Sequence, residues 1–331
     1  ILLDPFLLLF GFTSLLFYFK YRRNLTTYYL LLTTIFAGLA ISIKWTGLSF
    51  VALPILIEAC RKHEINYPIG EFISRVLKFS SFFLISLAIY ISVFALHFVL
   101  LPKPGPGDAF MKPGFRKNNI IKNIADLNIE MYKSNQRLGA THPYGSAWYS
   151  WPFMARPIYY WNGSTPSTDS GQANSPQVNQ TDAGDDVSSE ALAKEEKIYF
   201  MGNPIVWWSS TVAVIYGLWT MANGLWLKFK KAMPLPIVSG PLAVLMAGYF
   251  LNLLPFIGVK RVMFLYHYLT ALIFAILMLV CLIDQSKNRR KIFTGLLITA
   301  AAAFLFFAPL SYGLELSDKS YWARVWFASW R

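Results

Sequence analysis

Ionisable and phenolic side chains gather at the borders of long apolar runs in this sequence. They are Asp4, Lys44, Lys260, Arg261, Tyr266 and His267. Arg261 carries a planar guanidinium that stays charged and can hold a phosphate through two parallel hydrogen bonds. Lys44 and Lys260 would add positive charge, and the other side chains offer further hydrogen bonds. The set predicts a site for a lipid phosphate at the membrane surface.

Each of these residues also has a purely structural interpretation. Asp4 precedes Pro5 and could cap a helix. Lys44 could extend toward the lipid head groups, and Lys260 could belong to an ordinary turn. Arg261 could equally bind a phospholipid head group instead of a substrate. Both interpretations stay open at the level of the sequence.

Two more candidates, His142 and Asp108, lie in loops rich in turn residues, and either could merely support a turn. His267 could likewise be a packed histidine. The histidines of the chain are scattered, and the sequence contains no P-loop, HExxH, CxxC or nucleophile-elbow motif. We therefore expect no metal site and no cofactor.

The composition indicates a membrane protein. The chain has 331 residues, of which 55% are hydrophobic and 14% are charged, whereas a soluble domain carries about a quarter charged residues. Globular cores could not hide so much apolar surface, so we expect an all-α polytopic membrane protein in the lipid bilayer. The net charge of +13 then reflects membrane topology, and we expect no nucleic-acid partner.

Charge-free runs define the elements that must position the candidate residues. Eight runs are candidate membrane spans: 5–19, 24–43, 45–57, 79–102, 198–227, 232–259, 262–283 and 292–314. A single helix over 26–60 would overshoot the bilayer and place Lys44 near its middle, at a cost of about 3 kcal/mol. We therefore expect a tight turn at Lys44 and about eight transmembrane helices.

Basic residues are distributed unequally between the two sides of these spans. Fourteen Lys and Arg residues follow the first, third, fifth and seventh spans, whereas the opposite short turns hold three. The positive-inside rule places the fourteen in the cytoplasm and the candidate residues on the extracytoplasmic side. No charged residue falls in the middle of a span, which argues against an ion-coupled transporter. The pattern favours an enzyme that acts at the outer surface on a lipid-attached substrate.

The segment between spans four and five is expected to be extracytoplasmic. It contains apolar residues at helical spacing, which predict an amphipathic helix docked on the spans: Ile120, Ile124, Leu127 and Met131. The aromatic stretch 142–161 is typical of the membrane interface. The polar tract 162–197 predicts a disordered insertion. At the C-terminus, Trp322, Trp326 and Trp330 are spaced by four and predict one helix face that anchors at the interface.

Several short motifs together resemble the protein O-mannosyltransferase family. They are Leu2-Leu-Asp-Pro-Phe-Leu-Leu, Ile43-Lys-Trp-Thr-Gly-Leu, Gly105-Pro-Gly-Asp-Ala-Phe-Met, His142-Pro-Tyr-Gly-Ser, Gly202-Asn-Pro and Arg261-Val-Met-Phe-Leu-Tyr-His-Tyr-Leu. They run in order over almost the whole chain. The resemblance implies a C-type glycosyltransferase fold. It also implies inverting transfer of mannose from a polyprenyl-phosphate-mannose donor to Ser or Thr hydroxyls of an exported protein acceptor.

The resemblance also implies that part of the site lies elsewhere. The family's acidic Asp-Glu pair, whose Asp is the expected general base, sits in a first outer loop that would lie upstream of this chain. Because the chain begins at Ile1 and not at methionine, we expect a missing N-terminal part and assign no catalytic residue here. Eukaryotic members carry a β-trefoil module in the main outer loop. The sequence lacks it, so we expect the bacterial branch and a bacterial cell membrane, or the endoplasmic reticulum membrane if the source is eukaryotic.

Three regions and two alternative functions follow from this interpretation. Residues 1–103 would hold the remaining four spans of an N-terminal transmembrane glycosyltransferase domain, 104–204 the extracytoplasmic segment, and 205–331 four more spans and the Trp-rich outer tail.

A related enzyme could instead use a lipid acceptor, although the His142 and Gly105 motifs favour proteins. A lipid-sugar flippase would predict internal repeats or midplane charges, and the sequence has neither.

Overall fold

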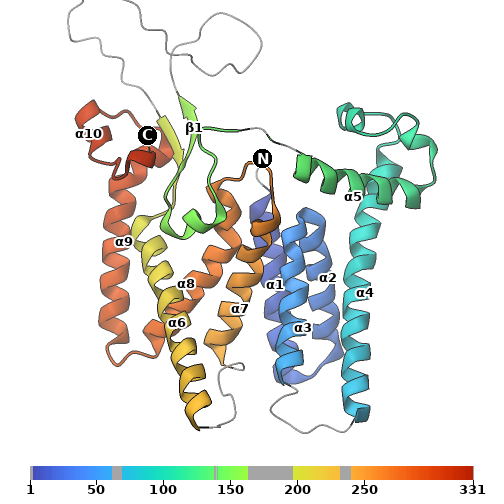
Figure 1. Ribbon diagram of the computed structural model, residues 1–331, viewed down its shortest axis with the longest axis horizontal. Helices are drawn as coiled ribbons and strands as arrows, with labels where there is room; N and C mark the ends of the chain where they lie inside the picture. The colour runs from blue at the N-terminus through green and yellow to red at the C-terminus, as the bar shows by residue number, and fades with distance from the viewer. Residues whose placement is uncertain are drawn as a thin grey trace, which may run out of the picture.

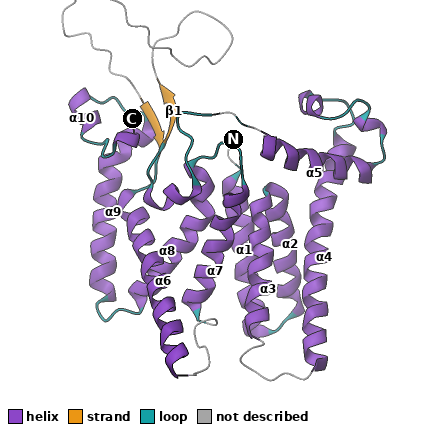
Figure 2. Cartoon of the chain, viewed as in Figure 1, coloured by secondary structure: helices purple, strands orange, loops and turns teal. Residues whose placement is uncertain are grey.

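The computed structural model describes residues 3–61, 69–137, 139, 141–162, 197–231 and 240–330. Long helices stand side by side, and short elements gather mainly at one end (Figures 1 and 2). The long helices are α1 (Asp4–Asn24), α2 (Thr27–Ile43), α3 (Ser49–Arg61), α4 (Ile69–Leu100), α5 (Ile120–Arg137), α6 (Pro204–Lys231), α7 (Pro241–Leu253), α8 (Leu269–Asp284) and α9 (Arg289–Tyr312). The shorter elements are the 3-10 helices η1 (Trp45–Leu48), η3 (Pro106–Phe110), η4 (Phe115–Lys117), η5 (Trp148–Phe153), η6 (Leu254–Gly258), η7 (Leu265–Tyr268) and η8 (Ala328–Trp330), the strands β1 (Ile158–Asn162) and β2 (Lys197–Phe200), and the helix α10 (Asp318–Trp322).

The chain is a mostly helical, multi-pass membrane protein. Each of the eight predicted spans coincides with one long helix, α1 to α4 and α6 to α9. Among the described residues, 5 helical segments are long and apolar enough to cross a bilayer, in α4, α6, α7 with η6, η7 with α8, and α9. Thr27–Ile43 and Trp45–Ala59 are shorter apolar helices. A total of eight crossings stays a prediction.

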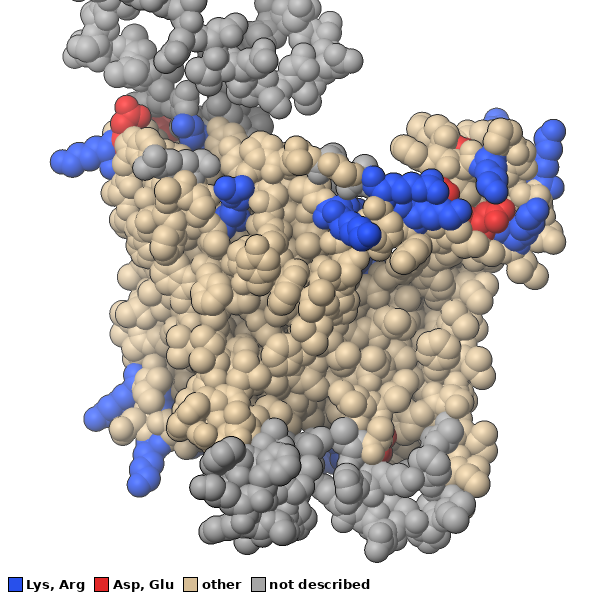
Figure 3. Space-filling view, in the orientation of Figure 1, with Lys and Arg blue, Asp and Glu red and all other residues tan. Residues whose placement is uncertain are grey.

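On the face shown in Figure 3, charged residues lie toward the two ends of the molecule and leave an uncharged band between them. One end, called here the hairpin end, carries β1, β2, α5 and the turn between α2 and α3 (Figure 1). The other end, called here the basic end, carries the links α1–α2 and α8–α9, with Arg22 and Arg23 in the last turn of α1. Such a band is the surface expected of a protein that lies in a bilayer.

The chain reverses direction at Lys44, as predicted. Helix α2 ends at Ile43, Lys44 is extended with φ −160° and ψ 140°, and η1 then leads into α3. Gly47 lies very close to the last turns of α2, where a Cβ would come within 2.4 Å of the Ala40 carbonyl carbon and oxygen. Only glycine allows such a close backbone approach, so Gly47 keeps the turn compact.

We expect Gly47→Ala to lower the free energy of unfolding by about 1–3 kcal/mol, because the new methyl group must push η1 away from α2. Denaturant titration of the detergent-solubilised protein measures this change. The matched control is Gly295→Ala in α9, where a Cβ would meet nothing within 4 Å and where alanine favours the helix. Equal losses in the two variants would contradict the packing argument.

The main core lies where α6, α7 and α8 meet. Half of the apolar segment of α8 is buried, against 6% for α9 at the edge of the bundle. Gly248 of α7 leaves room for the Phe274 ring of α8, which a Cβ would approach to 2.3 Å. Phe274 in turn contacts Phe12 of α1, with ring centroids 5.2 Å apart. These contacts join the first helices of the chain to the last ones.

Helix α5 is the predicted amphipathic helix, and it lies across the end of α4 (Figure 1). Ile124 of α5 packs with Phe98 of α4 and with Phe115, and Leu127 covers this small core. The structure thus docks α5 on α4 through Ile124 and Leu127, whereas the other two residues of the predicted face, Ile120 and Met131, are exposed. Ile121 on another side of the helix is 78% exposed, so part of the apolar surface of α5 remains outside this contact.

A two-stranded antiparallel sheet begins at the end of the aromatic stretch, and the sequence did not predict it. Ile158 pairs with Phe200 and Asn162 with Lys197. The expected all-helical fold therefore holds for the membrane part, while the hairpin end carries this sheet. The tract 162–197, for which we predicted disorder, lies outside the described residues apart from its two end residues.

The prediction that the tail tryptophans share one helix face is wrong. Helix α10 ends at Trp322, and the chain then turns. Trp326 and Trp330 stack with centroids 6.2 Å apart, and both contact Trp208 of α6. Trp330 is buried, and its Nε1 donates to the Met154 carbonyl at 2.9 Å. Aromatic packing on α6 outweighs the continuation of a short exposed helix.

Candidate functional site

Asp4 and Lys44 form an ion pair at the hairpin end. The Lys44 Nζ lies 3.1 Å from Asp4 Oδ1, and the two side chains are 28% and 10% exposed. The N-cap of α1 is Leu3, and no side chain caps this helix, so the capping interpretation of Asp4 is wrong. A mostly buried carboxylate without a cation costs more free energy than a helix end without a side-chain cap. The Lys44 ammonium also lies 5.4 Å from the centre of the Tyr266 ring.

Arg261 faces a histidine instead of a carboxylate. Its Nη2 lies 3.5 Å from His267 Nε2. On the other side of the ring, His267 Nδ1 lies 3.0 Å from the Phe264 carbonyl oxygen and 3.3 Å from the Phe264 backbone nitrogen. Within the part of the chain that the structure describes, Arg261 forms no ion pair. It is a half-buried cation whose charge is not neutralised there.

Tyr266 connects the two cations into one group. Its ring stacks on His267, with centroids 4.3 Å apart and 22° between the planes. It also stacks on Phe264 at 5.9 Å and contacts the Lys44 ammonium. The structure therefore brings together five of the eight residues singled out in the sequence: Asp4, Lys44, Arg261, Tyr266 and His267. Two cations and one carboxylate leave a net positive charge. Such a group can bind an anion such as a lipid phosphate.

His267 is held by aromatic residues that the sequence did not assign to the site. The Trp151 ring lies 5.8 Å from it and nearly parallel, at 12°, and Phe256 meets it edge-on at 5.4 Å. His267 is only 6% exposed. The aromatic stretch was expected only at the membrane interface, and its closeness to the His142 motif was the one signal that pointed to the site. The packing fixes the His267 ring beside Arg261.

The loop that contains His142 packs against the segment that follows Arg261. The backbone N–H of Ser146 donates to the Met263 carbonyl at 2.8 Å. The His142 ring meets the Phe264 ring at 5.1 Å. Its own Nδ1 accepts a 3.2 Å hydrogen bond from the backbone N–H of Tyr144. His142 is thus an exposed residue at the edge of the group, with one nitrogen engaged in the turn.

The remaining two candidates lie outside the group. Lys260 is exposed and makes no hydrogen bond or ion pair with any residue that the structure describes. Asp108 lies beside the end of α4, where it accepts a 2.5 Å hydrogen bond from Arg116 and one from the backbone of Gly105. The Arg116 guanidinium holds the pKa of the Asp108 carboxyl below its usual range. Asp108 therefore acts in this turn.

A chain of hydrogen bonds ties the Lys44 turn to α4 and α5. The Trp45 Nε1 donates to the Tyr90 hydroxyl at 2.9 Å, and this hydroxyl donates to Asn128 Oδ1 of α5. Asn128 is held in turn by the Ile124 carbonyl, to which its Nδ2 donates at 2.8 Å. Trp45 follows Lys44 directly, so the position of α5 is coupled to the residue next to the Asp4–Lys44 pair.

We expect Tyr90→Phe to lower the free energy of unfolding by about 1–2 kcal/mol, because both hydrogen bonds to the hydroxyl are lost while the ring remains. Denaturant titration measures the loss. Faster amide hydrogen exchange in α5 should accompany it. Tyr132→Phe is the control, because Tyr132 is 57% exposed and has no partner among the described residues. Unchanged exchange in α5 would show that the chain of hydrogen bonds does not couple the two elements.

Comparison with known families accounts for almost the whole chain. Residues 120–330 match the family described as the C-terminal four TMM region of protein-O-mannosyltransferase. Residues 1–102 match dolichyl-phosphate-mannose-protein mannosyltransferase. The Lys44 turn lies in the second match, and Arg261, Tyr266 and His267 lie in the first. The candidate site is therefore built from both matched regions.

Individual relatives are distant and longer than this chain. A polyprenol-phosphate-mannose–protein mannosyltransferase of Corynebacterium glutamicum is 24% identical over 331 residues, covering 90% of this chain and 57% of that protein. Dolichyl-phosphate-mannose–protein mannosyltransferase 1 of Saccharomyces cerevisiae is 26% identical, covering 64% of this chain and 24% of that protein. A solved structure of the S. cerevisiae protein O-mannosyltransferase Pmt1-Pmt2 complex bound to the sugar donor aligns with TM-score 0.48 and 24% identity, over 65% of this chain and 27% of that chain. The chain thus spans little more than half of the first relative and about a quarter of the second.

Proposed function

Because this chain belongs to the protein O-mannosyltransferase family, we propose that the complete protein transfers mannose from a polyprenyl-phosphate-mannose donor to Ser or Thr hydroxyls of exported proteins. The observation that carries the proposal is the unneutralised Arg261 beside Lys44 and Tyr266, at one end of an apolar bundle. A lipid phosphate is the anion that suits such a place. Family membership favours this activity over the lipid-acceptor transferase and the flippase.

In this mechanism an acceptor hydroxyl attacks the anomeric carbon of mannose as it loses its proton to a carboxylate base. The bond from the anomeric carbon to the phosphate oxygen breaks, so the configuration inverts and polyprenyl phosphate leaves. Negative charge grows on that phosphate, and Arg261 and Lys44 stabilise it. Asp4 is already engaged with Lys44, so we do not propose it as the base. The phosphate is a good leaving group, and the mechanism needs no metal.

The other residues receive roles that follow from their contacts. His267 orients Arg261 and is itself fixed by Trp151. Tyr266 is half-buried between the two cations. Its hydroxyl donates a hydrogen bond to the phosphate or to the sugar. His142, at the exposed edge, is placed to meet the acceptor or the sugar, while Lys260 contributes only long-range positive charge. For Asp108 we propose a role in folding the turn before α5.

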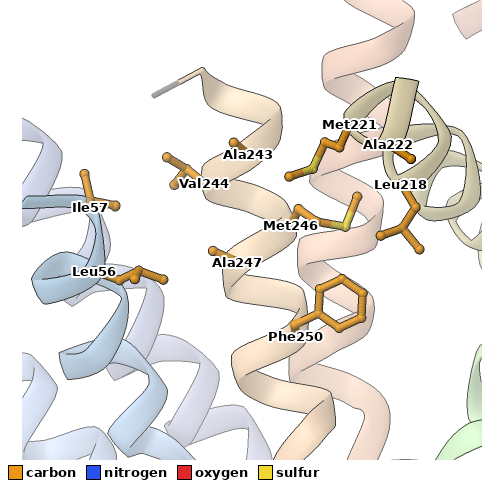
Figure 4. Close-up of a pocket in the computed structure, with 10 residues that line it drawn as sticks. All are labelled: Leu56, Ile57, Leu218, Met221, Ala222, Ala243, Val244, Met246, Ala247 and Phe250. Atoms are coloured by element: carbon orange, nitrogen blue, oxygen red, sulfur yellow. The ribbon is translucent and has the colours of Figure 1, made fainter. Parts of the chain in front are cut away.

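The prenyl chain needs an apolar path through the membrane. Figure 4 shows a pocket of about 410 Å³ between α3, α6 and α7. Ile57, Leu218 and Met246 are among its ten lining residues, all of which are apolar. We propose that part of the prenyl chain occupies this pocket. From the distribution of basic residues in the sequence we also propose that the hairpin end faces the extracytoplasmic side of a bacterial cell membrane.

The direct test incubates the purified complete protein with mannosyl-phospho-polyprenol and a Ser/Thr-rich peptide. We expect mass spectrometry to detect addition of one hexose to the peptide and release of polyprenyl phosphate. Replacing the donor with nucleotide-linked mannose should give no product. Transfer to lipid alone, or no transfer in an enzyme that binds the donor, would contradict the proposal.

A further inference from the structure

A second pocket with a single charged residue lies between α1, α7 and α8, toward the basic end. Its volume is about 390 Å³. Leu15 and Phe19 of α1, Leu245 of α7 and Leu277 of α8 are among its lining residues, and Arg22 is the one charged residue among them. An apolar pocket with a cation at one end has the shape and polarity of a site for a lipid with an anionic head group.

Arg22 is held in place by a buried carboxylate but keeps free hydrogen-bond donors. Its Nε lies 3.6 Å from Glu58 Oε1, and the Tyr18 hydroxyl donates to the same oxygen at 3.0 Å. The side chains of Arg22 and Glu58 are 31% and 10% exposed. Within the described part of the chain, the two terminal nitrogens of Arg22 have no hydrogen-bond partner. They can therefore form the paired hydrogen bonds that a phosphate accepts.

This pocket is separate from the Arg261 group. Helix α1 begins at Asp4, in that group, and Arg22 lies in its last turn. At about 1.5 Å per residue the two positions are roughly 27 Å apart, close to the thickness of the hydrocarbon core. One phosphate cannot contact both Arg22 and Arg261. A lipid phosphate at Arg22 therefore belongs to the leaflet at the basic end.

We propose that this pocket binds an anionic phospholipid, with an acyl chain between α1, α7 and α8 and its phosphate on the Arg22 guanidinium. Lys20 lies in the same part of α1 and adds positive charge, with its Nζ 5.6 Å from the Phe17 ring centre. A zwitterionic lipid carries an ammonium of its own, which this charge repels. Glu58 acts as the positioning group that keeps the arginine at the mouth of the pocket.

The test compares lipid binding by the complete protein and its variants with native mass spectrometry and thermal unfolding. We expect phosphatidylglycerol to bind about tenfold more tightly than phosphatidylcholine, because both lipids offer a phosphate to Arg22 but only phosphatidylcholine carries an ammonium that Arg22 and Lys20 repel. Arg22→Gln combined with Glu58→Gln, which removes both members of this ion pair, should remove this preference. Arg290→Gln, an exposed cation at the same end, is the matched control and should keep it.

Two further experiments separate the contribution of the Arg22 charge from that of Glu58, and binding of the phosphate from binding of the acyl chain. Glu58→Gln alone leaves Arg22 charged and should keep a preference for phosphatidylglycerol. Glycerol phosphate, which has the anion but no acyl chain, should neither bind nor stabilise. Equal binding of the two phospholipids by the wild-type protein, or an unchanged preference in the double variant, would overturn the proposal. Protection by glycerol phosphate equal to that by phosphatidylglycerol would also overturn it.

Discussion

We expect Arg261→Ala to lower mannosyl transfer by the complete protein by about 10²–10³-fold, the range seen when one preorganised donor to a developing anion is removed. Arg261 is half-buried, faces His267 at 3.5 Å and has no acidic partner among the described residues. Its charge is therefore available to the leaving phosphate. The loss should be in kcat as well as in kcat/KM, because the phosphate charge grows in the transition state.

Two other variants make this result specific. Arg261→Lys keeps the charge but loses the two parallel hydrogen bonds, and we expect it to recover only part of the activity. Lys319→Ala removes an exposed cation of the tail at the same end of the molecule and should transfer mannose normally. Initial rates with the lipid-linked donor and a peptide acceptor measure all three. Wild-type rates for Arg261→Ala would remove Arg261 from the mechanism.

The second large effect is expected at the Asp4–Lys44 pair. Lys44→Met leaves the Asp4 carboxylate, 10% exposed, without its cation. Removing one member of a buried pair costs about 3–5 kcal/mol, and the partial exposure of Lys44 reduces our expectation to about 2–3 kcal/mol of unfolding free energy. Mannosyl transfer should fall as well, because one of the two cations at the phosphate is lost.

A double variant separates the structural role of Lys44 from its role in binding. Asp4→Asn with Lys44→Met removes both charges, so we expect most of the stability to return while transfer stays low. Denaturant titration and the transfer assay, run on the two single variants and the double variant, complete the cycle. Recovery of transfer together with stability would mean that Lys44 only supports the fold.

Several features of the fold could be predicted from the sequence because they depend on local patterns. Long charge-free runs must become helices in a bilayer, since every backbone polar group needs an internal partner there. A lysine in the middle of a membrane-spanning helix costs free energy, so the position of Lys44 within the apolar run was enough to predict a turn there. The helical spacing of Ile124 and Leu127 likewise predicted α5 and its docking face.

The tail and the hairpin show where local patterns fail. A spacing of four between Trp326 and Trp330 is compatible with a helix, but the structure stacks both rings on Trp208, far away in the sequence. Strands β1 and β2 pair across the tract 163–196, so no neighbouring residues mark the register. In both places contacts between residues far apart in the sequence determine the backbone conformation. A pattern over a few neighbouring residues carries no information about such contacts.

For the candidate site, the sequence determined which ionisable groups stand at the ends of the spans, because burying an unpaired charge in lipid is too costly. Only the tertiary structure decided which of them meet. Helix packing pairs Asp4 with Lys44, which lie 40 positions apart. It places Arg261 beside His267, with no acidic partner among the residues that the structure describes. It also buries Trp151 against that histidine and leaves Asp108 with Arg116. These partnerships depend on how helices cross in space, and the order of residues along one helix does not specify that.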